Sequence, residues 1–348
     1  MQMDTMMMND SKMEFTNDSE EINGTVDDEP SNGRSAYIMP LTVFSLAMCF
    51  LGLLGNGTVF WILCFKMKRN HFTIYILNLA VADFTYLLGL WLWMVYTFCV
   101  LNGVRSPATV EGYIAFFMGL VYNFGFNTSI YLLMLIALER CLAVLYPFWY
   151  QCYRPNTLSV YLSITSWLLS VLVTGLENLL CTGNQQYQAP GSQSCTNVYF
   201  FTSALYLIVL LIMVTSSLTL LFKIQTASKQ CHPPKVYIVI IICVTIFLIS
   251  VVPARILGLL IYFNVLQSKP FLVAFFFITS LCSAFNCSAN PYIYMAVGRR
   301  GKLKTEKGSI KQMLEKVFKD ATETENTTKN TYIIKDSWET KYNMPIPE

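Results

Sequence analysis

The sequence predicts an all-α membrane protein: a seven-transmembrane helix bundle with an amphipathic eighth helix on the inner leaflet. Hydrophobic residues make up 54% of the 348 residues and charged residues only 13%, which is too apolar for one soluble domain of this size. Seven apolar segments each exceed the roughly 20 residues that a spanning helix needs, and none alternates as a membrane strand does. The segments are 37–65, 71–100, 111–143, 157–180, 197–224, 235–263 and 270–297, so the bundle is expected to fill residues 37–297.

The first 36 residues are polar and acidic. Residues 1–36 hold nine acidic residues against two basic ones, and a segment of this composition buries too little apolar surface to fold alone. Glycosylation motifs begin at Asn9, Asn17 and Asn23, and they matter only if this end is extracellular. No signal-peptide pattern precedes the first apolar segment, which is therefore expected to direct insertion.

Basic residues in the connections predict the orientation in the plasma membrane. They follow the first, third, fifth and seventh apolar segments, whereas the opposite side offers only Arg105 and Lys269. Because cytoplasmic loops carry an excess of lysine and arginine, the N-terminus is expected outside and the C-terminus inside.

Two further parts follow the bundle. Residues 298–319 combine lysines with apolar residues at helical spacing, which predicts an amphipathic helix on the inner leaflet. Residues 320–348 predict a disordered cytoplasmic tail with threonines that kinases could phosphorylate. The apolar residues of the amphipathic segment are Leu303, Ile310, Leu314, Val317 and Phe318.

Two sets of polar residues interrupt the apolar segments. Glu139 and Arg140 end the third segment, so Arg140 either snorkels to the lipid headgroups or belongs to a charge latch inside the bundle. Asp83 lies about 18 Å into the second segment at ~1.5 Å per residue. Its expected partners suit a sodium ion or, more simply, a buried hydrogen-bond network. These partners are Ser129, Asn286 and Asn290.

Motifs on successive segments resemble those of the rhodopsin-like G-protein-coupled receptors, over residues 37 to about 318. They are Gly55-Asn56, Leu79-Ala80-Val81-Ala82-Asp83, Glu139-Arg140-Cys141, Trp167, Pro253 and Asn290-Pro291-Tyr292-Ile293-Tyr294. The Glu-Arg-Cys sequence, with Leu-Tyr-Pro-Phe-Trp-Tyr after it, is similar to the Mas and Mas-related branch. The chain departs from most of the superfamily in having no cysteine at the top of the third segment, Val251 in place of an aromatic switch, and no proline in the fifth segment.

The resemblance implies a plasma-membrane receptor that binds an extracellular ligand and activates a heterotrimeric G protein, Gq or Gi, with arrestin and receptor kinases as further partners. Arg140 would engage the G protein, and Tyr294 would move to support it. Glu139, Cys141, Pro253, Asn290 and Pro291 complete the expected activation residues.

Other classes fit less well. A transporter predicts inverted repeats, which the sequence does not show. His71 and His232, the two histidines, lack metal-ligand spacing, so neither an enzyme nor a metal centre is expected. The lysines and arginines are scattered, which argues against nucleic-acid binding. A constitutively active receptor without a cationic ligand remains the alternative.

Three cysteines are expected on the outer side: Cys99, Cys181 and Cys195. The resemblance suggests that Cys181 and Cys195 pair, which contributes ~3 kcal/mol by loop entropy and leaves Cys99 free.

Glu177, Arg255 and Tyr122 are expected in one layer near the extracellular mouth. Each lies 20 or 21 residues from the cytosolic end of its segment, or about 30 Å. Glu177 is four residues before Cys181, where Mas-related receptors carry an acid that binds cationic ligands, here a basic peptide or a cationic small molecule. Either Glu177 binds the ligand's basic group, or it pairs structurally with Arg255. The other expected lining residues are Asn123, Phe126, Tyr206 and Phe276.

Overall fold

The computed structural model describes most of the bundle and a short segment beyond it. The described residues are 31–67, 70–104, 107–155, 157–181, 193–227, 235–262, 269–299 and 309–318. The predicted glycosylation sites Asn9, Asn17 and Asn23 and the tail 320–348 lie outside these residues.

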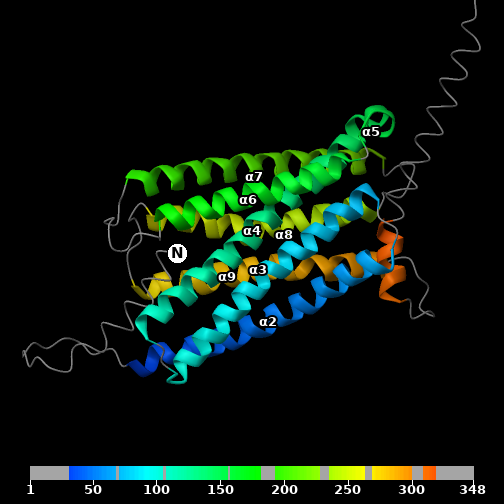
Figure 1. Ribbon diagram of the computed structural model, residues 1–348. Helices are drawn as coiled ribbons and strands as arrows, with labels where there is room; N and C mark the ends of the chain where they lie inside the picture. The colour runs from blue at the N-terminus through cyan, green and yellow to red at the C-terminus, as the bar shows by residue number, and fades with distance from the viewer. Residues whose placement is uncertain are drawn as a thin grey trace, which may run out of the picture.

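Each of the seven predicted segments corresponds to one long helix, so the all-α fold class is confirmed (Figure 1). By length and hydropathy, five of these helices qualify as membrane spans within the described residues, and α8 contributes the shorter apolar stretch Tyr237–Pro253. A short helix, α5 (Pro147–Cys152), follows α4 and was not expected from the sequence. The long helices are α2 (Ser31–Phe65), α3 (His71–Leu101), α4 (Ala108–Leu145), α6 (Leu158–Cys181), α7 (Gln193–Ala227), α8 (Lys235–Tyr262) and α9 (Lys269–Arg299).

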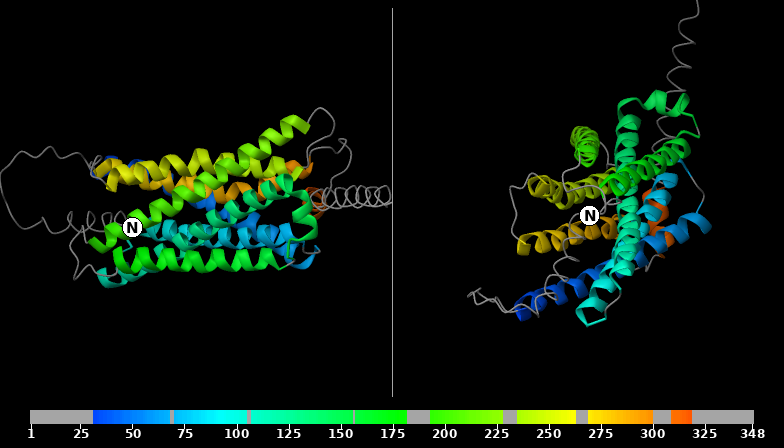
Figure 2. Two further views of the ribbon diagram at one scale, coloured as in Figure 1. Left: turned by 90° about the horizontal axis from the view of Figure 1, so that it is seen from above. Right: turned by 60° about the vertical axis from the view of Figure 1, so that its left-hand side comes forward.

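Helix α4 runs through the middle of the bundle and contacts α3, α6, α7 and α8 (Figure 2). In its most apolar window 67% of the residues are buried, against 28–33% in the other four qualifying spans. The polar residues in the second half of α4, from Asn127 to Arg140, are buried against other helices, so a site built there can receive side chains from most of the bundle.

Two glycines let α3 and α4 approach closely. A Cβ atom at Gly125 of α4 would lie 2.4 Å from the backbone nitrogen of Tyr86, and one at Gly89 of α3 would lie 2.8 Å from that of Tyr122. Small residues at membrane helix crossings permit this backbone contact. The crossing fixes the position of α4 relative to α3 at both glycines.

The end of the bundle where α4 finishes and α3 begins, called here the α5 end, also holds the last described helix, residues 310–318. This C-terminal helix lies across the α5 end (Figure 1). Leu314, Val317 and Phe318 are buried there, as the predicted apolar stripe requires. Ile310, which was assigned to the same stripe, is 41% exposed, and Leu303 falls outside the described residues.

Candidate functional site

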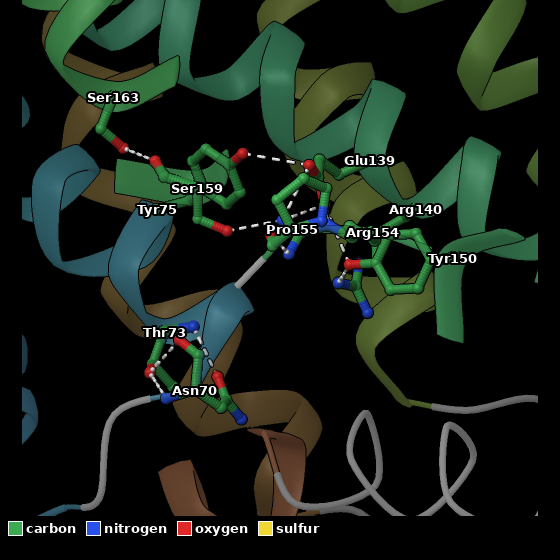
Figure 3. A network of polar contacts seen from close by, with 10 residues as sticks. All are labelled: Asn70, Thr73, Tyr75, Glu139, Arg140, Tyr150, Arg154, Pro155, Ser159 and Ser163. Carbon is green, nitrogen blue, oxygen red and sulfur yellow. Dashed lines mark hydrogen bonds and ion pairs between the residues drawn. The ribbon is translucent and has the colours of Figure 1, made fainter. Parts of the chain in front are cut away.

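An ion pair between Glu139 and Arg154 is the centre of a buried polar cluster at the α5 end (Figure 3). Arg154 follows α5, and its Nη2 donates to both carboxylate oxygens of Glu139 at 2.9 Å while its Nε donates at 3.2 Å. The two side chains are 2% and 5% exposed, so the pair is shielded from solvent. Nη2 of Arg154 also donates to the hydroxyl of Ser159 at 2.6 Å, which ties the pair to α6.

Tyr150 of α5 links Arg140, the neighbour of Glu139 in the sequence, to this ion pair. Nη2 of Arg140 donates to the Tyr150 hydroxyl at 2.7 Å, and that hydroxyl donates to Glu139 at 2.9 Å. The hydroxyl of Tyr75, from α3, donates to Glu139 at 3.1 Å. Burial raises the pKa of Tyr150 to about 12, although Arg140 acts to lower it. The hydroxyl therefore keeps the proton that it donates to Glu139 at any physiological pH.

Arg140 faces the inside of the bundle. It is 4% exposed, and its guanidinium carbon lies 4.8 Å from the centre of the Phe72 ring and 5.5 Å from that of Tyr150. Its Nε is buried without a hydrogen-bond partner in the described part of the chain. Of the two alternatives drawn from the sequence, the structure excludes a snorkelling arginine.

The charge of Glu139 is thus paired with Arg154 and not with its neighbour Arg140, although Tyr150 contacts both. Neither partner was predicted: Tyr150 appeared only as the last residue of the Leu-Tyr-Pro-Phe-Trp-Tyr motif, and nothing in the sequence distinguishes Arg154 from the other basic residues at span ends. Arg154 stays charged: burial lowers its pKa, but the hydrogen bonds to Glu139 and the electrostatic attraction of its surroundings together leave the pKa above its ordinary value.

A second buried network surrounds Asp83 in the middle of the bundle. The hydroxyl of Ser129 donates to one carboxylate oxygen, and Nδ2 of Asn290 donates to the other at 2.8 Å. Asn286 is also buried, but no hydrogen bond joins it to Asp83 among the described residues. The Oδ1 atoms of Asn286 and Asn290 are buried acceptors without a hydrogen-bond partner in that part of the chain. Three of the four residues proposed for this site are therefore directly connected.

Several of the predicted ligand-site residues form aromatic contacts in the opposite half of the bundle. Tyr122 and Phe126 of α4 pack against Tyr86 of α3, with ring centres 6.5 and 5.5 Å apart, and Phe276 of α9 packs against Trp93 at 6.4 Å. The sequence analysis missed Trp93, a tryptophan inside an aromatic-rich apolar run. It is 4% exposed, and its indole N–H has no hydrogen-bond partner where the chain is described.

The remaining members of the predicted ligand site are spread over four helices. Glu177 of α6 is partly buried, three residues beyond Thr174, whose hydroxyl accepts a hydrogen bond from Asn127 of α4 at 3.0 Å. Asn123 is also partly buried, and Tyr206 of α7 packs against Phe247 of α8. The side chain of Arg255 lies outside the described residues, so its pairing with Glu177 stays untested.

The remaining residues that were predicted to take part in activation lie in different surroundings. Cys141 and Tyr294 are buried, Pro291 lies against Gly55 of α2, and Pro253 is exposed on α8.

Among the cysteines, Cys195 is disulfide-bonded and Cys99 is free, as predicted. The side chain of Cys181 lies outside the described residues, so its pairing with Cys195 stays a prediction.

The chain is similar to known receptors over most of its length. Residues 55–294 match the family model of the 7 transmembrane receptor (rhodopsin family). The chain is 34% identical to the proto-oncogene Mas of Homo sapiens over 325 residues, which cover 87% of this chain and 94% of the relative. It is 39% identical to the Mas-related G-protein coupled receptor member H of Mus musculus over 284 residues, covering 79% and 82%. It is 32% identical to the Mas-related member X1 of Homo sapiens over 306 residues, covering 86% and 91%.

Removing Arg154 is expected to destabilise the protein more than removing the whole ion pair. Arg154→Ala leaves a buried, uncompensated carboxylate at Glu139, which typically costs about 3–5 kcal/mol. Adding Glu139→Gln removes that charge and should recover part of the loss. The measurement is thermal unfolding of the two single variants and the double variant in detergent. A double variant that unfolds at or below the temperature of Arg154→Ala would contradict the pairing.

Proposed function

The chain belongs to the rhodopsin family of seven-transmembrane receptors, in the Mas and Mas-related branch, and we propose that a cationic extracellular ligand activates it and that Arg140 couples it to Gq or Gi. As a G-protein-coupled receptor it is a multi-pass protein of the plasma membrane, with an extracellular ligand and a G protein as partners, and it is not an enzyme. The α5 end then faces the cytoplasm, the N-terminus is extracellular, and arrestin and receptor kinases act on the cytoplasmic side.

The observation that carries the coupling proposal is the separation of Arg140 from Glu139. Arg154 already neutralises Glu139, and among the described residues the polar contact that restrains Arg140 is the hydroxyl of Tyr150. The connection between α7 and α8, residues 229–235, contains no acidic residue that could hold Arg140 from across the bundle. A neutral hydroxyl binds a guanidinium more weakly than a carboxylate does. The resting state therefore holds Arg140 loosely.

The wild-type receptor is expected to signal measurably without a ligand, because Arg140 is held loosely. Glu139→Gln should raise this signalling several-fold, because the Tyr150 hydroxyl loses its carboxylate acceptor and restrains Arg140 less, whereas Arg140→Ala should abolish it. The measurement is nucleotide exchange on purified Gq and Gi with receptor of verified expression. A well-expressed receptor with no basal exchange would show that another contact holds the inactive state.

The position of Glu177 supports the cationic-ligand proposal. On α6, Ser170, Thr174 and Asn178 are fully buried, and Glu177 lies beside them at the edge of this buried face. It is therefore turned toward the bundle and reachable from the extracellular half. A carboxylate in such surroundings forms a strong charge-assisted hydrogen bond with a basic group. The aromatic residues on α4 and α9, which pack against α3, suit the apolar part of a peptide or an amphipathic amine.

Glu177→Gln is expected to weaken agonist potency strongly. The loss of a desolvated charge contact costs on the order of 2–5 kcal/mol, mostly through faster dissociation. Glu111→Gln is a matched control, since Glu111 is a partly buried acid in the first turn of α4. The measurement is agonist dose–response at equal surface expression. Potency within a few-fold of wild type would instead favour the structural pair with Arg255.

We also propose a sodium ion beside Asp83. The free Oδ1 acceptors of Asn286 and Asn290 fit a cation, because they lie in a fully buried site that carries one carboxylate. Asp83, Ser129, Asn286 and Asn290 would hold the ion, and it would neutralise the buried charge.

Sodium chloride is therefore expected to stabilise the receptor more than choline chloride at equal ionic strength. At ten times the dissociation constant, a ligand that binds only the folded state adds about 1.4 kcal/mol. Thermal unfolding in the two salts measures the difference, which Asp83→Asn should remove. Equal unfolding temperatures for the wild type in both salts would show that no sodium ion binds at this site and that Asp83 belongs to a hydrogen-bond network only.

A further inference from the structure

Trp93 of α3 holds a buried hydrogen-bond donor that nothing described so far uses. Its side chain is 4% exposed, and its indole N–H makes no hydrogen bond within the described ranges of the chain. Buried tryptophans usually place this N–H on an acceptor, because a buried donor without one loses the hydrogen bonds that it made to water. A phenylalanine would fill the same place without that loss. The N–H therefore calls for a partner.

The side chains around Trp93 are mostly apolar. Its ring centre lies 6.1 Å from that of Tyr96 and 6.4 Å from that of Phe276. Leu90 and Met94, its neighbours on α3, are 2% and 0% exposed. Of these four neighbours only Tyr96 carries a hydroxyl group. A buried water molecule needs roughly two to four polar partners, so these surroundings hold water poorly.

Trp93 lies on the face of α3 that meets the predicted ligand residues. Tyr86 is seven residues earlier, which is the same face of a helix, and its ring packs against those of Tyr122 and Phe126 of α4. Phe276 of α9, another predicted ligand residue, contacts Trp93 directly. Since α3 begins at the α5 end, Trp93 lies farther from that end than Tyr86 does. The N–H is thus placed in the outer, aromatic part of the proposed ligand site.

We propose that Trp93 donates this hydrogen bond to an uncharged acceptor of the ligand, such as an amide or ketone carbonyl oxygen. A carboxylate fits less well, because one neutral donor among aromatic rings does not offset the desolvation of an anion. The inference rests on the proposed cationic ligand and adds a second polar group to it. Helix α4 contacts both α3 and α6, so Trp93 and Glu177 lie on helices at different sides of α4. The ligand therefore carries a basic group and a carbonyl group joined by an apolar part.

Matched guanidines test the acceptor. One series consists of ω-guanidinoalkyl phenyl ketones with linkers of different length, and the other of ω-phenylalkylguanidines, in which a methylene group replaces each carbonyl. Both series carry a cation for Glu177 and an aromatic ring, so they differ only in the acceptor. The best ketone should bind the purified full-length receptor about three- to tenfold more tightly than its hydrocarbon counterpart, as one neutral hydrogen bond allows. Thermal unfolding at increasing probe concentration measures the affinities.

Trp93→Phe keeps an aromatic ring and removes the N–H. It should lower the affinity of the ketone to that of the hydrocarbon and leave the hydrocarbon unaffected. Trp91→Phe is the matched control, because Trp91 is a partly buried tryptophan two residues earlier, on another side of α3, and this variant should keep the wild-type preference. Glu177→Gln should weaken both series alike and leave the preference for the ketone in place.

NMR of the receptor with isotope-labelled tryptophan reports the N–H itself. The indole signal that is missing from Trp93→Phe belongs to Trp93, and in the wild type it should move downfield when the ketone binds. Equal affinities of the two series overturn the inference, as does a ketone preference that survives Trp93→Phe or an indole signal that the ketone leaves unmoved. Affinities that do not respond to Glu177→Gln contradict the proposed cationic site instead, which separates the two failures. If neither series binds, the cationic-ligand proposal is wrong and the inference falls with it.

Discussion

The buried carboxylate of Glu139 determines how the α5 end is built. At the edge of a membrane an unpaired charge is costly, so the protein has to supply partners for it from within. Glu139 receives hydrogen bonds from α3 through Tyr75, from α5 through Tyr150, and from the following connection through Arg154. The short helix α5 and the start of α6 are thereby fixed against α4. Arg140, the neighbour in sequence, is left with a neutral partner and two aromatic rings, and the proposed coupling to a G protein uses this weaker restraint.

Hydroxyl side chains on α6 show how polar residues are accommodated inside the bundle. Buried Ser163, Ser166 and Ser170 each donate to the carbonyl oxygen four residues earlier in their own helix. This local bond satisfies the hydroxyl without any partner on another helix. Small side chains of this kind allow close packing against α4, and the same face leads to Glu177 at the far end of α6. The proposed ligand carboxylate therefore stands on a rigid, well-packed support.

The helices were predictable from the sequence, whereas the partners of the buried charges were not. Span length and hydropathy are local properties of the sequence. The ends of each predicted segment therefore lie within a few residues of the ends of a helix in the structure. Ser129 and Asn290 were predicted beside Asp83 because a buried carboxylate needs hydroxyl or amide partners, and both hydrogen bonds are present. Arg154 was missed because its pairing depends on the path of the chain through α5, which hydropathy does not report. The burial of Phe318 together with the exposure of Ile310 likewise depends on where the C-terminal helix docks, and not on its amphipathic pattern.

The glycine crossing of α3 and α4 has a mechanical consequence. Since Gly125 and Gly89 bring the two backbones into direct contact, α3 and α4 cannot slide past each other without a collision between main chains. We therefore expect α3 and α4 to move as one rigid unit that carries Asp83, Ser129 and Arg140. Helix α8 contacts α4 much less than it contacts α9, so α8 is the less tightly held neighbour of this pair. In the proposed receptor, a ligand that moves α8 therefore moves it relative to a fixed pair formed by α3 and α4.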